Sequence, residues 1–389
     1  MTPLRRSRAL AVFLILAAAG TLLVQTSGAI RAEAVQNADW DTFGGDAYRT
    51  GYNPNETVIG TGNVGNLHLL WSFDLGAVTI SQPAYAAGVN VGGTAKDLVL
   101  AGSEHGMLFA LDATNGQVVW SRYLGDQQTG CGDMPDGRFG VSGTPAIDRS
   151  ANRVYEAGGD GAVYALDLST GATIPGWPIA VTPDPTHEHV YGALTLYLNR
   201  LYATVASYCD FTPYHGKVVG IDTSMPARTA VWYPVGNGGV SGGGIWGPGG
   251  VSLDPGNGHV FAATGNALTF PENYRYAETV DELGPRLRVL GSNKPSLTGG
   301  DVDFGATPLL YQAPGCPPQA VAKNKSGVLL LYDRGQLNAG YVQRLQIASV
   351  GDWEFNGIPA YDPATNMVYI GNSSDAGIYT HGMVTLAVQ

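Results

Sequence analysis

Residues 242–266 bring together side chains that could bind a ligand. The stretch reads GGGIWGPGGVSLDPGNGHVFAATGN, so Trp246 lies among six glycines and Asn266 ends the segment. An indole on so bare a backbone offers a flat apolar surface, and an amide oxygen is a ligand that hard cations accept. Both residues also have a structural interpretation, as a packed aromatic and as a turn asparagine. A functional site here requires two β-like segments to bring the ring and the amide together.

The rest of the chain repeats one short pattern that would supply such segments. FALDATNGQVVW recurs as YALDLSTGATIPGW, and more loosely as VGIDTSMPARTAVW and LLYDRGQLNAGYV. Asp112, Asp167 and Asp222 mark the first three copies at equal spacing, and Asp333 follows two periods later. Each copy reads as short alternating strands joined by Gly, Asn and Asp turns. Four strands in a unit of roughly 50 residues are typical of a β-propeller blade.

The aspartates and tryptophans of the repeat have structural roles in this interpretation. Each aspartate is expected to accept backbone N–H bonds from the turn that follows it. The tryptophans are expected to fill the gaps between neighbouring blades, where an aromatic side chain buries a large area. These are Trp71, Trp120, Trp177 and Trp232.

The sequence predicts an all-β fold, a propeller of four-stranded antiparallel blades with about six blades' worth of chain. Opening strands are expected near Pro83, Pro145, Ala193, Gly249, Pro308 and Pro359. The sixth unit has no fourth strand, whereas residues 66–76 look like a fourth strand without a blade. These residues could close a six-bladed ring by pairing with residues 383–388. Alternatively, the chain is a shortened form of a larger propeller, which is the interpretation we favour.

The N-terminus reads as an export signal. Three arginines precede an apolar run over residues 9–24, and Ala32-Glu33-Ala34 fits a small-x-small cleavage pattern. We therefore expect a signal peptide at 1–34, an extended segment at 35–65 and the propeller at 66–389, in a secreted or periplasmic protein. An uncleaved membrane anchor is the alternative. The net charge of -11 argues against a nucleic-acid partner.

Three cysteines would meet an oxidising compartment after export. Cys131 lies in a loop entering the second blade, and Cys209 lies between the second and third strands of the third blade. In a propeller these connections share a face, whereas Cys316 lies between first and second strands on the opposite face. We therefore predict a Cys131–Cys209 disulfide that excludes Cys316.

The repeat, the DWDTFGGDAYRTGYNP opening and several loop motifs resemble the quinoprotein alcohol dehydrogenases, enzymes that use pyrroloquinoline quinone (PQQ) with calcium. The resemblance covers about residue 39 to the C-terminus. It implies that Trp246 stacks on the quinone and that Asn266 binds calcium. In AKNKSGVLLLYDR it implies that Lys325 contacts the quinone oxygens. In CGDMPDGRFG it implies that Arg138 pairs with a PQQ carboxylate.

Three positions depart from the family pattern. Gly132 follows Cys131, so the family's disulfide between adjacent cysteines cannot form. The second calcium ligand is a glutamate in the family, and Asp210 is the nearest carboxylate here. The family's catalytic aspartate follows a longer loop, so Glu272 is the closest match and Glu278 the second choice.

The resemblance implies an exported PQQ-binding propeller that oxidises an alcohol or sugar and passes electrons to an external acceptor. The alternative is a cofactor-free scaffold that binds a protein or a polymer of the cell envelope. The sequence has no Walker-type glycine loop and no serine nucleophile elbow, so turns explain its other glycine clusters.

Overall fold

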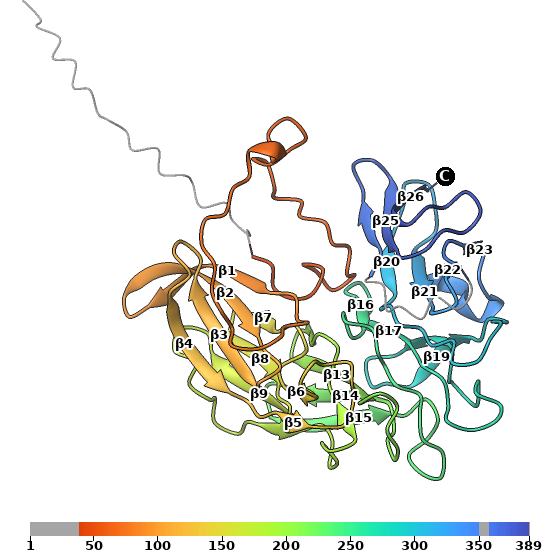
Figure 1. The fold of residues 1–389 in the computed structure, drawn as a ribbon, viewed down its shortest axis with the longest axis horizontal. Helices are drawn as coiled ribbons and strands as arrows, with labels where there is room; N and C mark the ends of the chain where they lie inside the picture. Colours follow the sequence, from red (N-terminus) through yellow and green to blue (C-terminus); the bar gives the residue numbers. More distant parts are fainter. Residues whose placement is uncertain (1–38, 350–357, 389) are drawn as a thin grey trace, which may run out of the picture. The chain divides into compact units, whose positions relative to one another are not determined.

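The structure is a computed structural model that describes residues 39–349 and 358–388, and its strands form successive antiparallel sheets (Figure 1). The expected signal peptide lies outside the described residues. The first sheet contains β1 (Ala84–Val91), β2 (Thr94–Gly102), β3 (Met107–Asp112) and β4 (Val118–Tyr123). The second contains β7 (Ala146–Asp148), β8 (Arg153–Ala157), β9 (Ala162–Asp167) and β10 (Ile179–Ala180). The third contains β11 (Glu188–His189), β12 (Thr195–Tyr197), β13 (Arg200–Ser207), β14 (Lys217–Asp222) and β15 (Ala227–Trp232).

The remaining elements continue the series. The fourth sheet contains β16 (Ser252–Asp254), β17 (His259–Ala263), β18 (Val280–Leu283) and β19 (Val289–Asn293). The fifth contains β20 (Leu309–Tyr311), β21 (Gln319–Lys323), β22 (Val328–Asp333) and β23 (Gln343–Gln346). The sixth contains β24 (Ala360–Asp362), β25 (Met367–Asn372) and β26 (Gly382–Ala387). A small β5 (Gln127–Gln128) and β6 (Arg138–Phe139) ribbon and two 3₁₀ helices, η1 (Val64–Asn66) and η2 (Arg334–Ala339), complete the elements.

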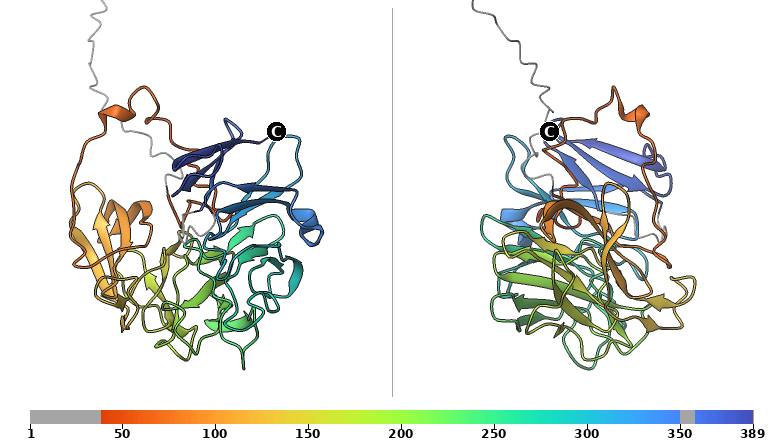
Figure 2. Two further views of the ribbon diagram at one scale, coloured as in Figure 1. Left: turned by 45° about the vertical axis from the view of Figure 1, so that its right-hand side comes forward. Right: turned by 90° about the vertical axis from the view of Figure 1, so that its left-hand side faces the viewer.

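Strands that are neighbours in sequence are neighbours in five of the six larger sheets, for example β1-β2-β3-β4 and β20-β21-β22-β23, whereas the third sheet has the order β11-β13-β14-β15 with β12 beside β13. The first strands also contact one another in series, β1 with β7, then β12, β16, β20 and β24. The views in Figure 2 show the sheets in the same order as the chain. This is the expected all-β propeller architecture of four-stranded antiparallel units. Among the described residues, no helix has the length and apolar character needed to span a membrane.

Residues 40–50, here called the N-terminal tract, hydrogen-bond to the first strand of every sheet or to a residue beside it. Trp40 pairs with Tyr85 in both directions, and Arg49 donates to Thr195 Oγ1 at 2.6 Å. The other contacts are Ile147 N to Asp41 O, Thr42 Oγ1 to Leu194 O, Leu253 N to Ala47 O, Leu310 N to Tyr48 O, and Tyr361 N to Thr50 O. One short segment therefore connects all six sheets.

The repeat aspartates adopt the expected role. In the second unit, Asp167 Oδ1 accepts the backbone N–H groups of Ser169 at 3.0 Å and Thr170 at 2.9 Å. The same contact recurs from Thr114 N to Asp112, from Ser224 N to Asp222 and from Gly335 N to Asp333. Each carboxylate therefore fixes the turn between the third and fourth strands.

Tryptophans fill the early gaps between sheets, as the repeat predicts. Trp120 packs with residues of the second sheet, and its Nε1 donates to Leu168 O at 2.9 Å. Trp177 and Trp232 are buried at the next two interfaces. Trp71 lies against Gly116, where an added Cβ would be 2.6 Å from its ring, and donates to Ala113 O.

The expectation of a strand at residues 66–76 is wrong. These residues belong to no sheet, and Leu69 and Leu70 are exposed. Strand β26 pairs with β25 alone, so the sixth sheet has three strands and the two segments do not pair. The side-chain pattern of a strand is present at 66–76, and Trp71 and Phe73 pack against the first sheet without pairing with it.

Candidate functional site

Three carboxylates from two connecting segments lie close together. Asp210 lies between β13 and β14, and Asp301 and Asp303 lie in the segment before β20. One oxygen from each lies within 4.8 Å of the others. Lys325, which follows β21, places its Nζ 2.9 Å from Asp301 Oδ1 and 2.7 Å from Asp303 Oδ2. The cluster thus contains three acidic groups and one ammonium.

Asn266 connects to this cluster through its backbone, because its N–H donates to Asp303 Oδ1. The Asn266 side chain is buried, at 5% exposure, and its Oδ1 has no hydrogen-bond partner among the described residues. A buried amide oxygen without a donor is destabilising. A cation with carboxylate and amide ligands would satisfy it, so these residues fit an oxygen-liganded metal site.

Burial shapes the electrostatics of the cluster. Burial raises the pKa of Asp303 to about 7 and also raises the pKa of Asp210. Burial opposes the charge on Lys325, but Asp303 and Asp301 outweigh it and raise the pKa of the ammonium. The acidic groups are therefore short of positive charge, which favours cation binding.

Trp246 lies beside the cluster in the loop between β15 and β16. A Cβ added at Gly244 would lie 2.7 Å from its ring, and one at Gly265 would lie 2.6 Å from it. The Gly265 position is also 2.7 Å from Asp303 Oδ1, so this glycine adjoins both the indole and the carboxylate. Tyr191 packs on the same indole, with ring centroids 5.6 Å apart. Positions 244 and 265 therefore require glycine, because any side chain there would clash with the indole of Trp246.

The two candidate bases reach the same region. Glu272 Oε2 accepts the backbone N–H of Asp301 at 2.7 Å. Glu278 is buried, and its N–H donates to Gly265 O at 3.0 Å. Burial, and then the charge of Glu272, raise the pKa of Glu278 to about 7. Both glutamates therefore lie around the Asp301–Gly265 region.

Arg138 behaves differently from the other expected site residues. Its guanidinium pairs with Asp126 and is 42% exposed. None of its side-chain hydrogen bonds or ion pairs within the described residues reaches the carboxylate cluster. The local motif that suggested a quinone contact places Arg138 on the β6 ribbon instead.

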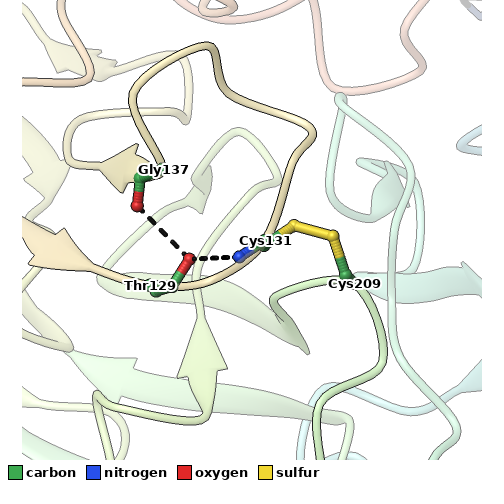
Figure 3. Close-up of a disulfide and its surroundings, with 4 residues drawn as sticks. All are labelled: Thr129, Cys131, Gly137 and Cys209. Atoms are coloured by element: carbon green, nitrogen blue, oxygen red, sulfur yellow. Dashed lines mark hydrogen bonds between the residues drawn. A yellow bond between two sulfur atoms is a disulfide. The ribbon is translucent and has the colours of Figure 1, made fainter.

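The predicted disulfide is confirmed. Cys131 and Cys209 are bonded, with Cα atoms 5.5 Å apart, and Cys316 is free. Figure 3 shows the bond joining the loop that starts near Thr129 to the loop that carries Cys209, and Thr129 Oγ1 accepts the N–H of Cys131 at 3.1 Å. Since Asp210 follows Cys209 directly, the disulfide anchors the loop that carries one cluster carboxylate.

The sequence analysis missed Asp301 and Asp303. Their motif, GGDVDFGATP, places two carboxylates one residue apart in a glycine-containing segment before an opening strand. Because this motif ends at Pro308, where an opening strand is expected, its two carboxylates could have been marked as candidate ligands. The family resemblance instead indicated Glu272 and Glu278, in the segment PENYRYAETV, as the candidate bases.

Part of the chain matches a known protein family in sequence. Residues 40–181 match the family described as "PQQ: Glucose/ethanol/alcohol dehydrogenase, beta-propeller domain". The matched residues span the first and second sheets. No curated protein gives a significant match to the chain.

Three solved structures share the fold of this chain at low sequence identity. Quinohemoprotein alcohol dehydrogenase ADHIIG from Pseudomonas putida HK5 has a TM-score of 0.69 and 16% identity, over 85% of this chain and 56% of that one. The quinohemoprotein alcohol dehydrogenase from Comamonas testosteroni has a TM-score of 0.67 and 17% identity, and the match covers 87% of this chain and 58% of that one. A europium-containing methanol dehydrogenase has a TM-score of 0.66 and 17% identity, and the match covers 90% of this chain and 73% of that one. The chain thus spans less than two thirds of either alcohol dehydrogenase, and these likenesses show the shared fold.

Proposed function

We propose that this PQQ-type propeller is an exported quinoprotein dehydrogenase that binds PQQ and a metal ion and oxidises an alcohol or sugar. The observation that carries the proposal is the buried, unpartnered Asn266 Oδ1 beside the carboxylates of Asp210, Asp301 and Asp303. A disulfide between Cys131 and Cys209 is consistent with export, because such bonds persist in oxidising compartments.

In this proposal, Asn266 and the cluster carboxylates hold the cation, which is calcium by family resemblance. Trp246 provides a flat surface for the quinone, and Lys325 lies where it could donate to quinone oxygens. When bound, the quinone would accept a hydride from the substrate, and its electrons would leave to an external acceptor. The protein supplies the stacking surface, the oxygen ligands and the positioned charge.

The substrate hydroxyl must lose a proton, and the glutamates are the proposed acceptors. Glu278, with its pKa raised to about 7, is suited to take up a proton at a carboxylate oxygen near neutral pH. Glu272 is the first choice from the resemblance, and it also holds the backbone of Asp301. Replacement with glutamine preserves the shape of each side chain and removes its basicity.

The direct test is retention of the cofactor. The purified protein is mixed with PQQ and calcium and passed through gel filtration, and quinone absorbance is measured in the protein peak. Trp246→Ala should weaken retention roughly fivefold, since stacking contributes on the order of 1 kcal/mol beyond area burial. Trp71→Ala, which removes an indole from the first sheet, is the matched control and should retain PQQ like the parent. Equal retention in both variants would contradict the proposed stacking role.

Turnover is tested separately with a panel of alcohols and sugars and an artificial electron acceptor. Glu272→Gln should retain PQQ and lose turnover, and Glu278→Gln should do so if Glu278 is the base. Full activity in one variant removes that residue from the role.

A cofactor-free scaffold remains the second candidate, and the position of Arg138 favours it. This arginine pairs with Asp126, so its charge is already balanced within the chain. Lys325 also partly balances the cluster charge within the chain itself. Failure of the parent protein to retain PQQ at any calcium concentration would favour a scaffold that binds a protein or a cell-envelope polymer.

A further inference from the structure

A cavity of about 200 Å³ lies between the fifth and sixth sheets, in a part of the molecule that the proposed quinone site does not use. One wall comes from β22 and β23, including Leu329, Leu331 and Leu345. The other comes from β25 and β26, including Val368 and Leu386. The two walls belong to one apolar cluster of the fold.

The cavity lies where other interfaces hold an indole. In the first sheet, Trp120 pairs with Ala110, two residues before the repeat aspartate. The equivalent position in the fifth sheet is Leu331, and it pairs with Gln343.

The third sheet places its indole at the neighbouring position. There Trp232 pairs with Val218, four residues before the repeat aspartate. The equivalent residue of the fifth sheet is Leu329, and its partner is Leu345. Both positions that carry tryptophan elsewhere thus carry smaller side chains here, and Gln343 and Leu345 both line the cavity.

The chemistry of the walls limits the occupant. Leucine and valine form much of both walls, and Tyr311, Gln319, Gln343 and Tyr379 add polar groups to the lining. Such a mixed lining suits a flat ring that packs on the aliphatic side chains and carries a polar substituent, because small-molecule sites combine a mainly apolar wall with a few polar groups. Gln343 is exposed and offers one amide at the edge of the cavity.

We propose that this cavity is a binding site for a small, flat, apolar molecule of one or two fused rings. The ligand takes the place that the indoles of Trp120 and Trp232 take at other interfaces of the same fold. A polar substituent on the ring would meet the polar side chains of the lining, which are Tyr311, Gln319, Gln343 and Tyr379. This site is independent of cation and quinone binding.

The test uses indole as the probe and isothermal titration calorimetry on the full chain. The parent protein should bind indole saturably at one site. Leu345→Trp should weaken binding at least tenfold and raise the thermal midpoint, because the new side chain fills the cavity. Leu290→Trp, the same change at a partly exposed position on β19, is the matched control and should leave indole affinity within twofold.

A second variant keeps the test decisive if Leu345→Trp fails to fold. Leu386→Phe reduces the cavity from the opposite wall and should also weaken indole binding. Absence of saturable binding in the parent would overturn the proposal. Parent-like affinity in the folded cavity variants would overturn it as well, because the probe would then be bound elsewhere.

Discussion

Asn266 has a buried amide oxygen that the folded chain leaves without a donor. Asn266→Ala should weaken calcium binding by roughly 10- to 100-fold, since interactions of polar groups with charged ones are worth about 1.5–3 kcal/mol. The calcium-free protein should lose much less, because the deleted oxygen makes no hydrogen bond. Calorimetric calcium titration and urea unfolding separate the two effects. Asn115→Ala, in an exposed turn, is the control, and equal calcium affinity in all three proteins would refute the ligand role.

Asp281 predicts how stability depends on pH away from the cluster. Its side chain is fully buried, and burial raises its pKa to about 7, against about 3.9 in an unfolded chain. Between these values the folded state holds the proton more tightly, so the free energy of unfolding should fall as pH rises from about 4 to 7. Asp281→Asn should flatten this fall, by up to about 1.4 kcal/mol per pH unit. Urea unfolding at several pH values measures this pH dependence, and a slope in the Asp281→Asn variant identical to the parent's would contradict the role of Asp281.

The family resemblance and its loop motifs marked part of the candidate site. Trp246, Asn266, Asp210 and Lys325 lie in loops whose motifs marked them, and the structure brings their segments to one region. Arg138 could not be placed from its motif, because its nearest counter-charge, Asp126, is set by the pairing of a short ribbon that the sequence does not reveal.

At the scale of an element, each turn between third and fourth strands depends on one carboxylate. Asp167→Ala removes acceptors for Ser169 N, Thr170 N and Thr170 Oγ1. We expect a loss of about 1–3 kcal/mol in the free energy of unfolding, because each net hydrogen bond contributes about 0.5–1.5 kcal/mol. Asp167→Asn keeps an acceptor oxygen and should lose less. Chemical denaturation checks the order, and equal losses in the two variants would contradict it.

Elements were predictable where a local signal repeats. The aspartate fixes a turn, and a proline near the start of a unit precedes an opening strand, as Pro145 precedes β7 and Pro308 precedes β20. Residues 66–76 have the same strand-like pattern but form no strand. A strand needs a partner with free backbone groups, and that partner is a property of the assembled sheets rather than of the segment.

At the scale of the whole molecule, Arg49 fastens the N-terminal tract to the third sheet. This side chain is buried, and it donates to Thr42 Oγ1, Phe43 O and Thr195 Oγ1. Arg49→Met should lower the free energy of unfolding by about 3–5 kcal/mol, because several buried acceptors lose a charged donor. The midpoints of thermal unfolding measured by fluorescence and by circular dichroism should fall by the same amount. Arg153→Met, on the less buried edge of β8, is the control, and a similar small shift in both would contradict the proposed role of Arg49.

The N-terminal tract also has a consequence for the order of events during synthesis. Its residues leave the ribosome before any of the strands to which they bond, and the last of these partners, Tyr361, follows only after five sheets have been made. Contacts between residues so distant in sequence form slowly. The later positions of the tract must therefore stay unpaired while the sheets appear one after another. A binding partner that captured residues 40–50 during this interval would delay maturation of the entire protein without touching any strand.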